Sequence, residues 1–114
     1  MNEVMQQWVA ALRSGEYLQG RGKLERVEED GTSYFCCLGV LCKLAEQAGI
    51  VNRRAAIDQG IVWFSYSDSM PPSEVYIWSG LSYVRAVKYA HMNDSDHKTF
   101  NEIADAVEAD HEPA

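Results

Sequence analysis

Apolar side chains in residues 34–45 recur at the spacing of a helix. The positions i, i+3, i+4 and i+7 are filled by Cys37, Val40, Leu41 and Leu44, a spacing typical of an α-helix. Leu38 and Gly39 stand where a surface helix would carry charged residues. A helix that is apolar nearly all round is buried. The pattern therefore predicts a central helix over residues 36–49, with the rest of the chain packed on it.

Amphipathic patterns predict further helices on either side. Residues 1–15 carry one apolar stripe, made of Met5, Trp8, Val9 and Leu12. Residues 99–110 carry another, and Thr99 with Glu102 has the spacing of a capping box. Two prolines favour a short helix over 72–79. Residues 83–90 fit either a strand or a helix, and we favour a helix because nothing interrupts it before Asn93.

Two segments have the signals of β-strands. The Asp30-Gly31 turn signal predicts a hairpin over residues 23–35. Residues 61–67 are rich in aromatic and β-branched side chains, which suit a strand. The sequence thus predicts one domain, residues 1–114, of the α+β class. We expect a small antiparallel sheet packed on a buried central helix, with flanking N- and C-terminal helices.

Charge is distributed unevenly along the chain. The net charge is −7, and residues 93–114 hold seven acidic residues and one lysine, which gives that segment −6. The remaining residues, 1–92, are nearly neutral. This balance argues against broad nucleic-acid binding, which needs clustered Lys and Arg. The acidic end fits a solvated surface, a site for a basic protein partner, or mimicry of a nucleic acid.

The chain has no apolar run of the roughly 18 residues that a membrane span needs. Three cysteines, two of them adjacent, do not form a disulfide framework. We therefore expect a cytoplasmic protein with reduced thiols and no membrane association.

Cysteine chemistry is one candidate activity. Cys36 or Cys37 would stand at a strand-to-helix junction, where the helix dipole lowers a thiol pKa. His91 could act as the base, with Asn93 or Asp94 orienting it. The alternative is that both cysteines are core residues. The Cys-Cys-x4-Cys spacing matches no zinc pattern, so we predict neither a metal nor a cofactor.

Aromatic residues crowd the segment from 63 to 89 and alternate with basic ones. The candidate binding residues are Trp63, Tyr66, Trp78, Arg53, Arg54 and Arg85. Such side chains can stack and charge-pair with a nucleotide. They are equally typical of protein interfaces, and the remaining reading is that most of them fill the core.

Several patches carry a resemblance to a known group of proteins. They are Phe35–Cys42, Ile77–Leu81, Met92–Asp94 and Phe100–Glu108, together with the opening Trp8–Tyr17. In these patches the chain resembles small accessory proteins of tailed bacteriophages and prophages. The resemblance implies expression in the cytoplasm of an infected bacterium, and it transfers no catalytic residue.

The function favoured by the sequence is binding without catalysis. The leading hypothesis is an inhibitor of a host defence protein, comparable to an anti-CRISPR protein, or of another host protein. A second hypothesis is a sponge for a nucleotide second messenger of host immunity. A third is a cysteine-dependent enzyme. A homo-oligomer is compatible with each of them.

Overall fold

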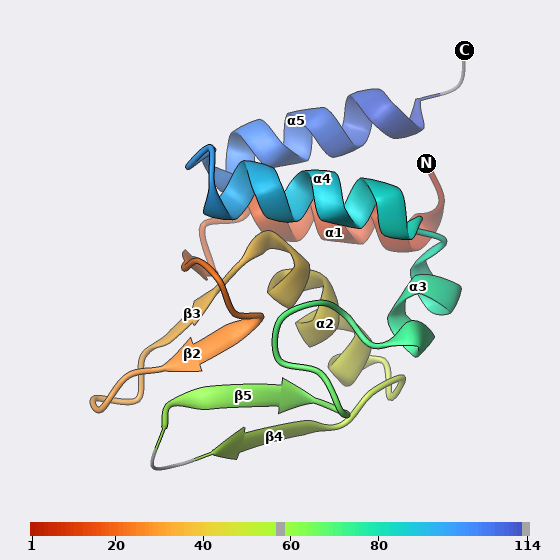
Figure 1. Ribbon diagram of the computed structural model, residues 1–114. Helices are drawn as coiled ribbons and strands as arrows, with labels where there is room; N and C mark the ends of the chain where they lie inside the picture. Colours follow the sequence, from red (N-terminus) through yellow and green to blue (C-terminus); the bar gives the residue numbers. More distant parts are fainter. Residues whose placement is uncertain (57–58, 113–114) are drawn as a thin grey trace.

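The computed structural model describes residues 1–56 and 59–112, and it confirms the α+β class. The helices gather on one side of a sheet (Figure 1). The helices are α1 (Glu3–Arg13), α2 (Cys37–Gln47), α3 (Ser73–Ser79), α4 (Tyr83–Asp94) and α5 (Phe100–His111). The strands are β1 (Leu18–Gln19), β2 (Glu25–Val27), β3 (Ser33–Phe35), β4 (Arg53–Ala56) and β5 (Ile61–Phe64).

The sheet has the strand order β1-β3-β2-β5-β4. The predicted hairpin is present as β2 and β3, and β5 pairs antiparallel with β2. The three predicted strands pair antiparallel, as expected, and the sheet is mixed because a strand that was not predicted, β1, pairs in parallel with β3. β4 was not expected, since Arg-Arg-Ala-Ala has no strand pattern. Every residue of β4 instead finds a partner on β5.

The predicted strand over residues 61–67 ends early, at Phe64. Ser65 has a φ of 55°, in the left-handed region that a strand cannot contain. The amide of Phe64 then donates to the carbonyl of Ser67 at 2.8 Å, which closes a tight turn. The chain therefore leaves the sheet three residues sooner than its composition suggested.

α2 is the buried central helix. Its first two turns are completely enclosed, and Cys36 is its N-cap residue, at the end of the hairpin as predicted. Gly39 lies against the backbone of Leu24, and a Cβ at position 39 would stand 1.7 Å from the Leu24 carbonyl oxygen. Only glycine permits this close approach of helix and strand. The indole of Trp8 donates to the Cys37 carbonyl at 2.9 Å and fixes α1 on α2.

The terminal helices pack side by side rather than at opposite ends of the molecule (Figure 1). The predicted capping box at Thr99 and Glu102 starts α5. Arg13 of α1 binds both Asp105 and Glu108 of α5. Part of the acidic end is therefore paired within the molecule. α4 is helical, as favoured, and continues to Asp94.

No helix in the described part of the chain combines the length and the apolarity needed to cross a membrane.

Candidate functional site

One face of the sheet is left without helices. Residues directly opposite each other on paired strands share a face. Arg26 lies opposite both Tyr34 and Ile61, and Arg54 lies opposite Trp63. We call this set, extended by Leu18 opposite Tyr34, the outer face. With Ala56 opposite Ile61, the outer face therefore holds Leu18, Arg26, Tyr34, Arg54, Ala56, Ile61 and Trp63.

The apolar members of the outer face take no part in the core. Tyr34, Ile61 and Trp63 are half-buried, and within the part of the chain that the structure describes none of them packs against the buried cluster, whereas Val27 on the other face does. Leu18 is 49% exposed. Strands that alternate in this way normally place polar residues on the solvated face. Apolar and aromatic side chains on that face therefore need another explanation than folding.

The opposite face of the sheet, the inner face, holds an ion pair between Glu25 and Arg53. Glu25 is buried, and its carboxylate accepts hydrogen bonds from Arg53 Nε at 2.8 Å and from the Ser33 hydroxyl at 2.7 Å. The hydrogen bond to Glu25 is the main reason that the pKa of Arg53 is raised. Arg53 was predicted to hold a ligand phosphate. In the structure Arg53 lies on the opposite face from Trp63, and its guanidinium forms an ion pair with Glu25.

Positive charge and aromatic surface meet on the outer face. The Arg54 guanidinium carbon lies 5.9 Å from the centroid of the Trp63 ring, within the range of a cation–π contact. Within the five strands, the charged residues on this face are Arg26 and Arg54. Both are exposed, on a protein whose net charge is −7. Of the six predicted binding residues, Trp63 and Arg54 are the two that the structure brings together.

The other predicted binding residues lie elsewhere. The hydroxyl of Tyr66 accepts from the backbone amide of Ser73 at 3.0 Å and donates to Glu74, so Tyr66 holds the start of α3. Trp78 packs partly against the core from α3. Arg85 is exposed on α4. The sequence reasoning missed Arg26, Tyr34 and Ile61. Ile61 shares a face with Trp63 by alternation along β5, whereas Arg26 and Tyr34 join that face only through the strand register.

The cysteines are not suited to nucleophilic catalysis. Cys36 and Cys37 are buried, and burial raises the pKa of Cys36 to about 12 and that of Cys37 well above its usual range. At the helix N-terminus the amide of Gly39 donates to the Cys36 sulfur at 3.4 Å. Desolvation outweighs this contact, so the expected lowering of the thiol pKa is wrong. His91 is exposed on α4, 3.6 Å from Asp96.

Comparison with protein families gives a match over residues 1–87, to a domain of unknown function, DUF8296. The chain belongs to the DUF8296 family. No curated protein and no solved structure shows detectable similarity to it. The matched part of this DUF8296 chain includes every residue of the outer face and ends within α4.

The DUF8296 match does not coincide with a complete core. α5 lies beyond it, yet Ile103, Ala104 and Val107 of α5 are fully buried against the rest of the molecule. The side of α1 that faces α5 would be open to solvent without them. In this chain the family segment therefore folds together with the residues that follow it.

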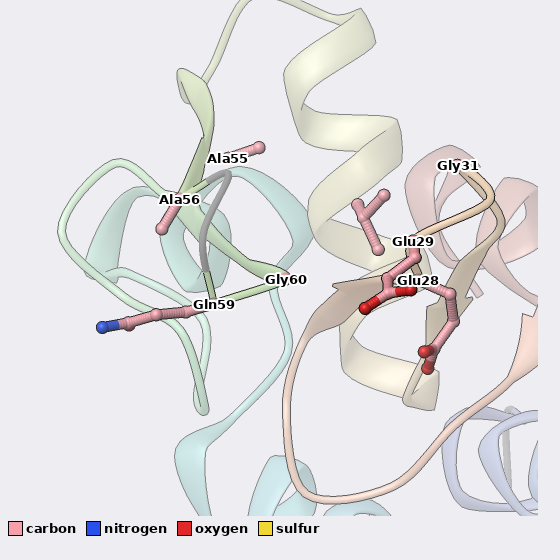
Figure 2. Close-up of a pocket in the computed structure, with 8 residues that line it drawn as sticks. Glu28, Glu29, Gly31, Ala55, Ala56, Gln59 and Gly60 are labelled. Carbon is pink, nitrogen blue, oxygen red and sulfur yellow. The ribbon is translucent and has the colours of Figure 1, made fainter.

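A cavity of about 450 Å³ in the DUF8296 chain is lined by the turn after β2, by the end of β4 and by the residues just before β5. Figure 2 shows Glu28 and Glu29 on one wall and Gln59 extending away from both carboxylates. These polar groups do not converge on a common point, as a small-molecule site requires. A second cavity, of about 400 Å³, is lined by Lys43, Glu46 and Arg53, whose charges are already paired. In the described residues, no group of His, Cys, Asp and Glu side chains is arranged to hold a metal ion.

Proposed function

We propose that this protein acts by binding another protein through the outer face of its sheet, without catalysis. The observation that carries the proposal is the set Tyr34, Ile61 and Trp63, which lies outside the core beside two exposed arginines. Trp, Tyr and Arg are the residues that contribute most binding energy at protein interfaces. The energetic cost of leaving these apolar side chains partly exposed is recovered when a partner covers them.

The charge of the outer face supports a partner of a particular kind. Arg26 on β2 and Arg54 on β4 lie on either side of Ile61 and Trp63 on β5, whereas the protein as a whole carries −7. A protein surface with carboxylates around an apolar anchor is complementary to this face and is repelled by the rest of the molecule. Such an arrangement favours one docking orientation.

The resemblance to phage accessory proteins supports a proposal about where the protein acts and which organism its partner belongs to. In that setting the partner is a protein of the infected bacterium, the binding takes place in its cytoplasm, and the consequence is inhibition of a defence protein or of another host protein. The burial of Cys36 and Cys37 supports binding over a cysteine-dependent reaction.

A nucleotide second messenger is the alternative ligand of the same face. The Arg54–Trp63 contact favours it, because a base can stack on an indole while a guanidinium pairs with phosphate. A thermal-shift screen against linear and cyclic nucleotides tests this alternative. A rise in melting temperature that is lost in Trp63→Ala would support nucleotide binding and displace the protein-partner proposal.

The proposal itself is tested by affinity capture from a bacterial lysate with quantitative mass spectrometry. The bait proteins are the wild type, Arg54→Glu, Arg26→Glu and a matched control, Arg21→Glu, whose side chain is exposed in the loop before β2. We expect one protein to be enriched by the wild type and by Arg21→Glu and to be lost with Arg54→Glu and Arg26→Glu. Equal enrichment by all four baits, or none by the wild type, would contradict the proposal.

A further inference from the structure

One edge of the sheet is open. β4 is the last strand in the order, and among the described residues no element lies along the side of β4 that faces away from β5 (Figure 1). A strand at an edge exposes backbone N–H and C=O groups that can pair with a strand of another chain. The strand at the other edge, β1, has two residues, whereas β4 has four. The longer open edge is therefore the one along β4.

The strand register shows which backbone groups of β4 bond to β5. The pairing continues one residue before β4, where the carbonyl of Asn52 accepts a hydrogen bond from the amide of Ser65 at 2.7 Å. Successive residues of an antiparallel strand direct their backbone groups alternately toward the paired strand and away from it. Arg54, two residues after Asn52, therefore directs its N–H and C=O toward β5.

Arg53 and Ala55 are the residues whose backbone groups face the open edge. Both lie one position away from residues that bond to β5, so the alternation turns their N–H and C=O outward. The residue opposite Arg53 agrees with this assignment, because the amide of Phe64 donates to the Ser67 carbonyl at 2.8 Å rather than to β4. An incoming strand would find two donors and two acceptors in a row.

The usual protections of an edge strand are mostly missing from β4. Natural proteins use proline, a bulge or charged side chains for this purpose. Arg-Arg-Ala-Ala contains no proline, and its four pairs with β5 follow an unbroken register. Arg53 is turned to the inner face and paired with Glu25. Arg54 is thus the charge that governs pairing at this edge, and within the described residues it forms no ion pair.

Arg54 opposes pairing with a second copy of the chain. The antiparallel register that uses the outward groups of both copies places Arg53 of one copy opposite Ala55 of the other. The two Arg54 side chains would then lie directly opposite each other on the outer face, where like charges destabilise a sheet. A strand with a carboxylate at that position would instead form a charge-assisted pair with Arg54.

We propose that the partner of the outer face contributes an extended segment that adds to the sheet along β4, with an acidic residue opposite Arg54. The inference rests on the proposed function, because it states how the partner of that function is held. In this mode of recognition the main-chain hydrogen bonds give affinity, and alternate side chains give specificity. The acidic residue would lie on the outer face beside Arg54, whose guanidinium is already near the ring of Trp63.

The test uses a blocked peptide, Val-Thr-Glu-Thr-Val, whose alternation places the glutamate and both valines on one face. The same peptide with lysine in place of glutamate is the matched control. Binding is followed by the amide chemical shifts of the isotope-labelled protein, up to millimolar peptide. We expect the largest changes at the amides of Arg53 and Ala55 and at the indole N–H of Trp63. The lysine peptide should bind about fivefold more weakly.

Two further variants test the backbone hydrogen bonds. Ala55→Pro removes an N–H that faces the open edge, which is where an edge strand tolerates proline, and Ala55→Thr keeps that N–H as the matched control. We expect Ala55→Thr to bind the glutamate peptide and Ala55→Pro to lose it, with unchanged circular dichroism spectra. A glutamate peptide that is N-methylated at both threonines leaves the protein unaltered and should not bind, because it lacks the donors.

An absence of changes at Arg53 and Ala55 would overturn the inference. Equal binding of the glutamate and lysine peptides, or undiminished binding of the N-methylated peptide, would do the same. Capture of a bacterial protein that is lost with Arg54→Glu but kept with Ala55→Pro would support the proposed function and contradict the added strand. Peptide binding along β4 by a protein that captures no bacterial partner would support the added strand and contradict the proposed function.

Discussion

The side-chain oxygen of Asn93 accepts a hydrogen bond from the backbone amide of Cys37 at 3.2 Å, across 56 positions of sequence. The same oxygen accepts from Gln19 Nε2, and the Asn93 amide nitrogen donates to the Gly20 carbonyl and to Asp94, each at 2.8 Å. Asn93 is fully buried, and this uses its complete hydrogen-bonding capacity. One side chain thus joins the end of α4, the start of α2 and the β1 segment.

Replacing Asn93 with alanine should be strongly destabilising. The change leaves the Cys37 amide and the Gly20 carbonyl without their partner, and a buried unpaired polar group costs about 1–3 kcal/mol. We expect Asn93→Ala to lower the free energy of unfolding by about 3 kcal/mol in urea titrations. Asn101→Ala, at an exposed site of α5, is the matched control and should change it by less than about 0.5 kcal/mol. Similar losses in both variants would contradict the role of Asn93.

The role of Asn93 could not be predicted from the sequence. It stands in a run of polar residues, which is typical of a solvated loop, and the sequence hypothesis made it an orienting group for His91. The structure continues α4 through Asn93 and turns its side chain inward, while His91 on the same helix faces solvent. A local pattern identifies a polar residue, but long-range packing decides whether it is buried.

Gly39 should not tolerate any side chain. An alanine Cβ would overlap the Leu24 carbonyl oxygen, so α2 would have to move away from β2. We expect Gly39→Ala to cost about 3 kcal/mol or more in the free energy of unfolding, since the clash is with backbone. Gly49→Ala is the matched control: its site is open, and only its φ of 77° opposes a side chain. That strain should cost about 1 kcal/mol. Equal stabilities of the two variants, measured by chemical denaturation, would contradict the close approach.

The ion pair of Glu25 and Arg53 gives a further prediction. Removing Arg53 leaves a buried carboxylate without its cation, and such a loss costs about 3 kcal/mol even with the arginine partly exposed. Arg54→Ala, one residue along the same strand but on the outer face, should cost less than about 1 kcal/mol. Thermal unfolding of the two variants compares them directly. If Arg54→Ala proved the more damaging change, our assignment of the two faces would be wrong.

The three cysteines should be unreactive in the folded protein. Cys36, Cys37 and Cys42 are buried, and burial raises the pKa of each thiol, to about 12 for Cys36. At pH 8 the folded thiols are neutral, and the thiolate is the reactive form. We expect no alkylation by iodoacetamide in native buffer and alkylation of all three thiols in denaturant, counted by intact mass. Rapid labelling of Cys36 in the native protein would support the hypothesis of a cysteine-dependent enzyme.

The elements of the fold were largely predictable, and the binding surface was predictable only in part. The central helix, the hairpin and the α5 capping box follow from local patterns that tertiary packing did not override. Trp63 and Arg54 stood out by residue type. Arg26 and Tyr34 did not, because β2 is too short to show alternation, and their place beside Trp63 depends on the register of β2, β3 and β5. Arg53 and Arg54 are adjacent in sequence, and the pleat of β4 places their side chains on opposite faces of the sheet.

The claim that the outer face binds a protein is tested most directly by site-specific photo-crosslinking in bacterial cells. A benzophenone amino acid replaces Tyr34, aromatic for aromatic on the outer face, or Asn101 on the exposed side of α5. We predict a discrete adduct with one bacterial protein from position 34 and none from position 101. No adduct from position 34, or the same adduct from both positions, would contradict the account.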